Sequence, residues 1–371
     1  MNLALVELRR RPGNFATATA ILALIATLLL LLGGLLDGLL SGATSAVRGL
    51  GADVIVYSST SENSFPRSRI DADTASSIAS LDGVSGVGGL GVTQLGARIP
   101  GKGPRDLADV ALFGYEVSPG GVPEAPGDGE GYADRRLKAS GVKRGDVLRL
   151  GPSRSPIKVI GWVEDLEYAG QATLWVNTGT WRSTLNANRP GSRMDAGAVQ
   201  ALVVTAGPGL TPSKLASRID RVTEGATSSL TTQEAIDAIP GVEEQQSTFG
   251  QIIGVTVVIA VIVVGLFFAL LTVERVGLYG VLKAIGATSG RLFAGLITQA
   301  LAVTAIASAL AMAAAVIMAA AVPDGAVPFR LDPARAASNI VNLLLAVVIG
   351  CAFSLRRVLR VDPASAIGSG T

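Results

Sequence analysis

The sequence predicts an α-helical membrane protein with four transmembrane helices and a large extracytoplasmic α+β domain between the first and second helices. The chain has 371 residues, of which only 16% are charged, and its mean hydropathy of +0.47 is unusual for a soluble protein. A helix needs roughly 20 apolar residues to cross a hydrocarbon core about 30 Å thick. Four segments meet this length: 15–36, 249–273, 292–322 and 336–355.

The first apolar segment has two interpretations. With Arg9, Arg10 and Arg11 before it, the segment could be a cleaved signal peptide. Its uncharged stretch is longer than the usual signal core of about 7 to 15 residues, which favours an uncleaved anchor. For all four segments the alternative is a buried core helix, which is an uncommon fate for so long an uncharged run.

Basic residues at the ends of the spans predict the orientation. Arg9 to Arg11 precede the first span, and Arg356, Arg357 and Arg360 follow the fourth. Because Lys and Arg are retained on the cytoplasmic side, we expect a multi-pass protein of the cell membrane with both termini in the cytoplasm. The expected segments are 1–14 cytoplasmic amphipathic entry helix, 15–36 first span, 37–248 extracytoplasmic α+β domain, 249–273 second span, 274–291 cytoplasmic coupling helix, 292–322 third span, 323–335 outer loop, 336–355 fourth span and 356–371 cytoplasmic tail.

The outer domain has strand and helix patterns in alternation. Thr211 followed by Pro212 predicts a helix start, with Leu215, Ile219 and Val222 on one apolar face. Thr231 and Glu234 form a capping-box pattern. The Pro- and Gly-rich stretch 118–132 predicts a surface loop or hinge. The expected strands are 53–57, 92–99, 109–115, 157–163, 173–176 and 200–205.

Two glycine-rich stretches resemble the sequence patterns of nucleotide-binding loops but lack the context that those loops require. In "GARIPGKG" the position after the lysine is Gly103, where a phosphate loop has the Ser or Thr that holds magnesium, so we interpret the motif as a turn. "GVGGLG", with Gly86, Gly88 and Gly91, runs into a strand pattern, whereas a dinucleotide fingerprint opens a helix. We expect a glycine-rich connection there.

The residue inventory argues against an enzyme. The chain has no histidine, which removes imidazole acid–base chemistry, the usual triads and the common zinc ligands. The only cysteine, Cys351, falls inside the fourth span. The carboxylates of the outer domain have no paired spacing, so if the chain moves something, a separate nucleotide-hydrolysing subunit must supply the energy.

The loop between the second and third spans, "VERVGLYGVLKAIGATSGRL", predicts a short amphipathic helix at the inner surface. Apolar residues repeat at i, i+4 and i+7, and Gly286 is placed to end the helix. Such a helix either anchors a tight reversal at the interface or docks onto a cytosolic ATPase. The residues expected to couple to that ATPase are Glu274, Arg275, Leu278, Leu282, Lys283, Ile285 and Gly286.

Several separated stretches resemble the MacB/FtsX-type ABC transporter permeases. "ERVGLYGVLKAIGATSGRLF" resembles the family's coupling-helix signature, "RVDPASAIG" at 360–368 its C-terminal tail, and "GVKRGDVLRLG" at 141–151 a strand of its outer domain. With "ALVELRRRP" at the entry to the first span, the resemblance covers nearly the whole chain. Within the family, 51–70 and 243–252 look most like the DevC and HrtB branch.

This resemblance implies the MacB-like type VII permease fold, a homodimer of the permease, and two copies of a cytosolic ABC ATPase that carries the ATP and magnesium. The chain itself would bind no cofactor and no metal, and would contact membrane lipid but no nucleic acid. Glycines at a dimer interface would permit close approach of the helices. The expected interface residues are Gly33 and Gly34 at the end of the first span, where Gly38 follows, and Gly250 and Gly254 on the second span.

The implied function is efflux by mechanotransmission, and the substrate is either haem or another hydrophobic amphiphile. Asp37, Glu243 and Glu244 lie at the mouths of the first two spans, where they either bind the substrate or simply solvate the helix ends. Without histidine, haem ligation would depend on these acids or on tyrosines such as Tyr57 and Tyr168. The alternatives are an FtsX-like mechanotransmitter that regulates a cell-wall hydrolase, and a lipid or lipoprotein extrusion permease.

Overall fold

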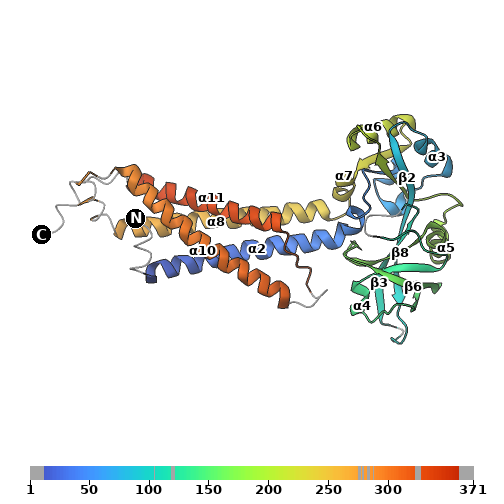
Figure 1. Ribbon diagram of the computed structural model, residues 1–371, viewed down its shortest axis with the longest axis horizontal. Coiled ribbons are helices and arrows are strands. Elements are labelled where there is room, and N and C mark those ends of the chain that lie inside the picture. The colour runs from blue at the N-terminus through green and yellow to red at the C-terminus, as the bar shows by residue number, and fades with distance from the viewer. Residues whose placement is uncertain are drawn as a thin grey trace. The chain divides into compact units, whose positions relative to one another are not determined.

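The computed structural model describes residues 12–103, 105–117, 122–274, 277, 280–281, 285–286, 288–321 and 327–358 (Figure 1). The chain divides into two compact units, the first made of Met1–Gly38 with Gln246–Thr371 and the second of Leu39–Gln245. We call the first unit the helical bundle and the second the outer domain, and each is described by itself.

The bundle contains four helices long and apolar enough to cross a membrane. Each helix extends beyond at least one end of its predicted span, and the last residue of the third predicted span, 322, lies outside the described residues. The four helices are α2 (Pro12–Arg48), α8 (Val242–Glu274), α10 (Ser289–Ala321) and α11 (Pro333–Val358).

Alanine is the commonest residue in the buried core of the bundle. Alanines such as Ala26, Ala260 and Ala307 are almost completely buried there, beside leucines and the ring of Phe268. α8 and α11 are in backbone contact at Gly265 and Gly350, where a Cβ added to Gly350 would lie 2.7 Å from the carbonyl oxygen of Val261 and 3.0 Å from the amide nitrogen of Gly265. Any side chain at Gly350 would therefore clash with the backbone of α8.

The outer domain is a ten-stranded mixed sheet with short helices, as the sequence predicts for an α+β domain. Its strands run in the order β10-β1-β9-β2-β3-β8-β4-β6-β5, and β7 pairs with β8. A further pairing of β2 with β5 closes six of the strands into a ring. The strands are β1 (Val54–Ser58), β2 (Val84–Arg98), β3 (Leu107–Tyr115), β4 (Glu130–Asp134), β5 (Val147–Leu150), β6 (Ser155–Val163), β7 (Glu167–Tyr168), β8 (Gln171–Asn177), β9 (Ala201–Ala206) and β10 (Thr227–Thr231).

Three helices of the outer domain start at a capping side chain. Asp71 and Asn177 accept a backbone N–H at the starts of α3 and α5, and Thr231 and Glu234 form the predicted capping box of α7. The helical segments are η1 (Ser59–Ser61), η2 (Phe65–Arg67), α3 (Ala72–Ala79), α4 (Arg136–Ala139), α5 (Thr178–Asn188), η3 (Pro190–Ser192), α6 (Pro212–Val222) and α7 (Thr232–Asp237).

Three local predictions need correction. The glycine-rich stretch that includes Gly86 and Gly91 is part of strand β2 and not a connection. Gly91 has room for no side chain, because the Trp181 ring lies where its Cβ would be. Glu130–Asp134 forms β4, so the loop predicted to reach residue 132 ends earlier, and residues 118–121 lie outside the described part. Val222 is exposed, whereas Leu215 and Ile219 are buried as expected. The turn predicted in "GARIPGKG" is present, with the Lys102 amide donating to the Ile99 carbonyl.

Candidate functional site

The first candidate site is the end of α2 that bears Asp37, together with the start of α11. Asp37 forms an ion pair with Arg335, and the two side chains are 10% and 39% exposed. The Arg335 amide also donates to the Asp332 carboxylate at 2.9 Å, which fixes the first turn of α11. The predicted substrate carboxylate Asp37 therefore already has a cationic partner within its own chain.

A short strap, which we define as residues 327–332, packs on the glycines of α2. The Arg330 amide donates to the Gly34 carbonyl at 2.9 Å, and the Phe329 ring occupies the space that a Cβ at Gly34 would fill. The Pro328 carbonyl lies in the same way against Gly38. Absence of side chains on α2 thus lets an extended segment lie directly on the helix backbone.

The predicted dimer glycines fall into two groups. Gly33 and Gly34 lie against Asn339 and Phe329 of the same chain, and the Asn339 amide donates to the Leu29 carbonyl at 3.1 Å. Gly250 and Gly254 face open space, with no atom within 4 Å of an added Cβ. Only the second pair remains free for contact with another copy.

The other predicted substrate residues lie at the start of α8. Glu243 and Glu244 are exposed in its first turn, where carboxylates are favourable beside the helix N-terminus. They belong to the outer domain, whereas Asp37 belongs to the bundle. Within the described residues, no three acidic or cysteine side chains gather as a metal site would require.

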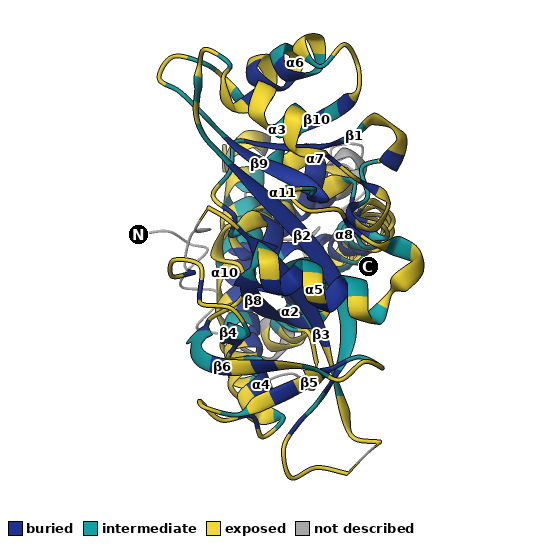
Figure 2. Ribbon diagram, turned by 90° about the vertical axis from the view of Figure 1, so that its right-hand side faces the viewer, coloured by how far each residue is buried: buried dark blue, intermediate teal, exposed yellow. Residues whose placement is uncertain are grey.

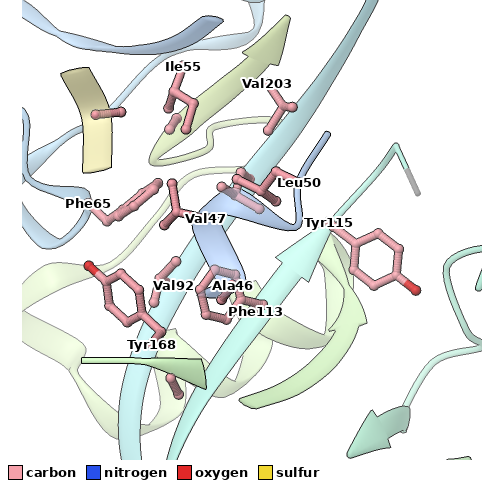
Figure 3. Close-up of a cluster of buried hydrophobic side chains, with 14 of the residues drawn as sticks. Ala46, Val47, Leu50, Ile55, Phe65, Val92, Phe113, Tyr115, Tyr168 and Val203 are labelled. Carbon is pink, nitrogen blue, oxygen red and sulfur yellow. The ribbon is translucent and has the colours of Figure 1, made fainter. Parts of the chain in front are cut away.

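The two tyrosines named as haem ligands are interior residues. Tyr57 and Tyr168 are 1% and 9% exposed and belong to a chain of aromatic contacts through Phe65 and Phe113 to Trp175 (Figure 3). Ring centroids in this chain are 4.5–6.0 Å apart, in edge-to-face or stacked geometry. Neither tyrosine can reach a large ligand, so this part of the prediction is wrong.

The same aromatic core holds the last turns of α2. Ala46 and Val47 are fully buried in it, next to Ile55 and Val203 of the sheet (Figure 3). The turn after β7 donates two backbone hydrogen bonds to this helix end, from Ala169 to the Ala43 carbonyl at 3.0 Å and from Gly170 to the Gly42 carbonyl at 2.9 Å. These bonds join the backbone of the last turns of α2 directly to the turn after β7.

Side chains secure this attachment of α2. The Glu167 amide donates to the Ser45 hydroxyl at 2.8 Å, and the Glu167 carboxylate forms an ion pair with Arg136. Burial raises the pKa of Glu167 above its usual range, although the Arg136 charge opposes this shift. Burial also raises the pKa of Asp134, whose carboxylate accepts the amides of Arg136 and Leu166. No sequence pattern singled out these residues, because Ser45 and Glu167 are 122 positions apart and the Arg136–Glu167 pair is 31 positions apart.

Most of the predicted coupling helix lies outside the described residues, namely Arg275, Leu278, Leu282 and Lys283. Of the rest, Glu274 ends α8 and is exposed, and Ile285 is 79% exposed. Gly286 has a φ of +100°, the left-handed conformation typical of the residue that follows a helix.

Comparison with protein families finds a match in the C-terminal part of the chain. Residues 251–363 match the model described as the FtsX-like permease C-terminal family, a range that includes most of α8 and all of α10 and α11. In this region the chain is similar to FtsX-like permeases.

Individual relatives agree with this class at low identity. A protein of Staphylococcus epidermidis that carries the name hemin transport system permease protein HrtB is 28% identical over 140 residues, 38% of this chain and 40% of that protein. The chain thus spans about two fifths of that relative's length. A Staphylococcus haemolyticus protein of the same name is 22% identical over 99% of both chains, and an uncharacterized ABC transporter permease of Mycobacterium tuberculosis is 26% identical over 98% of both.

Among solved structures, similarity is found to the periplasmic region of MacB from Actinobacillus actinomycetemcomitans. That match has a TM-score of 0.36 at 11% identity and covers 53% of this chain and 96% of the other. The extracellular domain of the transporter YknZ from Gram-positive bacteria matches with a TM-score of 0.33 at 12% identity, covering 48% of this chain and all of the other.

Proposed function

We propose that this chain is the permease of an ABC exporter that uses ATP hydrolysis by a separate ATPase to expel haem or another hydrophobic amphiphile from the cell membrane. Two permeases and two ATPase subunits form the complex, and both termini of each permease face the cytoplasm. The family match and the names of the relatives support this assignment.

One observation supports a mechanical route for the energy. α2 is a single helix from Pro12 to Arg48, and its last turns are built into the aromatic core of the outer domain. A continuous hydrogen-bonded helix resists bending, so a displacement imposed on it is passed along its length. The coupling segment receives the ATPase stroke, and the buried end of α2 delivers it to the outer domain.

The substrate proposal rests on the names of the relatives and on the remaining free carboxylates. Asp37 is paired with Arg335 and the two tyrosines are buried, so Glu243 and Glu244 are left as the predicted residues able to meet a cationic or iron-bearing amphiphile. The recess between α2 and α8, lined by residues such as Ile21 and Phe267, has a volume of only about 10 Å³. That is room for about one water, so in this conformation the amphiphile would bind elsewhere.

The substrate is tested with the permease and its ATPase co-purified in nanodiscs. We expect haemin to stimulate ATP hydrolysis, and the double variant Glu243→Ala, Glu244→Ala to lose the stimulation while it keeps basal hydrolysis. Stimulation by lipids alone would favour the lipid-extrusion alternative. Steady hydrolysis with no response to haemin, lipids, macrolides or peptides would favour the FtsX-like regulator of a hydrolase.

The mechanical route is tested by a proline in α2. Leu39→Pro removes a helix hydrogen bond and kinks the helix at a cost of about 3 kcal/mol, whereas Leu39→Ala only trims a half-buried side chain. We expect the proline variant to hydrolyse ATP without expelling substrate, and the alanine variant to do both. Export that survives Leu39→Pro would contradict the route.

Two further variants test the assembly. Leu282→Asp places a charge on the apolar face of the coupling helix and should release the ATPase from the permease. Gly254→Leu fills the open glycine face of α8 and should shift the permease from dimer to monomer in light scattering. A dimer that is unchanged by Gly254→Leu places the interface on another helix.

A further inference from the structure

The outer domain has an open cleft along α6 whose lining is basic. Its volume is about 450 Å³, within the usual range for small-molecule sites. α6 lies against the edge of the sheet formed by β10, β1 and β9 (Figure 2), into which it buries Leu215 and Ile219. The cleft is lined by Leu210, Ser213, Lys214, Ser217, Arg218 and Arg221.

Three cations share one flank of this helix. At 3.6 residues per turn, Lys214, Arg218 and Arg221 project within about 60° of one another and span about 10 Å along the axis. Like charges at these spacings destabilise a helix. In the described part of the chain, none of the three lies within ion-pair distance of a carboxylate. This concentration of positive charge occurs in a domain whose acidic residues outnumber its basic ones.

The acid nearest in sequence does not neutralise the cleft. Asp220 lies on α6 itself, but its carboxylate accepts hydrogen bonds from the hydroxyls of Thr227 and Ser229 and from the Ser229 amide, at 2.6–3.2 Å. Asp220 thereby fixes α6 to β10. Among the described residues, Asp220 forms no ion pair with the cations on the neighbouring flank.

The N-terminus of α6 adds to the positive electrostatic potential of the cleft. Its first turn has no acidic residue, Thr211 makes no side-chain cap, and Lys214 stands near the positive end of the helix dipole. In the same domain, α3, α5 and α7 have a capping side chain. An anion in the cleft would meet uncapped backbone N–H groups as well as the three cations.

We propose that this cleft binds a phosphate ester. Arginine guanidinium groups match phosphate oxygens in a two-point geometry, and a phosphate carries more charge per group than a carboxylate. The exposed Ser213 hydroxyl and the uncapped amides supply further donors, and Leu210 provides an apolar wall for the esterified group. The cleft volume of about 450 Å³ is suited to a compact ester.

The test uses the full chain in dodecyl maltoside, titrated calorimetrically at low ionic strength with inorganic phosphate, pyrophosphate and glycerol phosphate. We expect saturable binding that weakens as salt is added, because screening reduces the attraction. The variant Lys214→Gln, Arg221→Gln should weaken binding at least tenfold. The matched variant Lys143→Gln, Arg144→Gln removes two exposed cations elsewhere in the domain and should change it less than twofold.

A further pair of ligands separates the sources of the phosphate. Short-chain dihexanoyl phosphatidylglycerol that binds more tightly than glycerol phosphate would make the ester a lipid headgroup, and equal binding would make it a soluble compound. Equal losses in both double variants, or no saturable binding of any of these phosphates, would overturn the proposal. Tighter binding of an acidic peptide, lost in the α6 variant, would replace the phosphate ester with a protein partner. Thermal melting of both variants verifies that each remains folded.

Discussion

The outer domain and the helical bundle achieve burial in opposite ways. The domain buries large rings, with Trp175 and Trp181 completely inaccessible, whereas alanine is the commonest residue in the bundle core and Gly265 and Gly350 bring two backbones together. In water, large apolar surfaces provide the driving force for folding. In lipid the tails are as apolar as leucine, so helices associate through close packing and small residues. The same chain therefore follows two packing rules.

The largest effect is expected at the glycine crossing. Gly350→Leu would push a side chain into the backbone of α8, and since two helix backbones cannot shift as a flexible side chain can, we expect the bundle not to assemble. Size-exclusion chromatography in detergent would show aggregation or loss of the protein. Gly295→Leu, on α10, meets no atom within 4 Å and should elute as wild type. Normal elution of Gly350→Leu would contradict the view that the bundle depends on backbone contact at this glycine.

The second-largest effect is expected in the core of the outer domain. Trp181 packs over Gly91 and Gly114 and donates from Nε1 to the Thr93 hydroxyl at 3.1 Å, so Trp181→Ala should lower the free energy of unfolding by about 3–5 kcal/mol. All three tryptophans of the chain lie in this domain, so their fluorescence during urea unfolding reports on it alone. Trp162→Ala, at a half-buried ring under Lys138, should cost about 1 kcal/mol. Equal costs for the two variants would contradict the burial difference.

A third prediction concerns polar contact in the bundle. Arg335→Gln leaves the nearly buried Asp37 without its cation and should lower stability by about 1–2 kcal/mol, less than for a fully buried pair because the arginine is 39% exposed. Asp37→Asn combined with Arg335→Gln should recover part of the loss. Circular dichroism melts of the four proteins form a double-mutant cycle. Strictly additive losses would show that the pair has no coupling energy.

The smallest effect is a pH dependence at the end of α2. The pKa of Glu167 is raised by burial, so the folded domain binds its proton more tightly than the unfolded chain does. Its contribution is therefore favourable below the unfolded pKa, near 4.5, and is lost as the pH rises through the folded value. A glutamine at this position would not titrate, so the free energy of unfolding of Glu167→Gln should rise relative to that of the wild type as the pH increases above 4.5. Melting curves at several pH values measure the difference, and a constant difference would exclude Glu167 as its source.

The sequence predicted the elements that follow simple periodicity and missed those that depend on distant contacts. The four spans, the α6 start at Pro212 and the Thr231–Glu234 capping box were all readable locally. The second half of strand β2 was predicted as 92–99, but its first half was missed because glycines are poor strand formers. The Trp181 and Val117 side chains, which lie on Gly91 and Gly88, explain why glycine is needed there.

The candidate site was less predictable for the same reason. Asp37 was noticed as a carboxylate at a helix mouth, but its partner Arg335 lies 298 positions away. A cation at the start of an apolar span is itself a signal that it has a polar partner, and it was the one available clue. The strap at 327–332 has no periodic pattern, so its contact with α2 could be found only in three dimensions.

The glycine crossing of α8 and α11 also constrains how this protein can change over evolutionary time. A buried tryptophan can be replaced by progressively smaller residues at a graded cost, so the outer domain has many tolerable neighbours in sequence space. Glycine has no smaller substitute, and every replacement of Gly350 adds atoms against the backbone at Val261. Sequence change is therefore more accessible in the domain than at this crossing, where no single substitution is conservative.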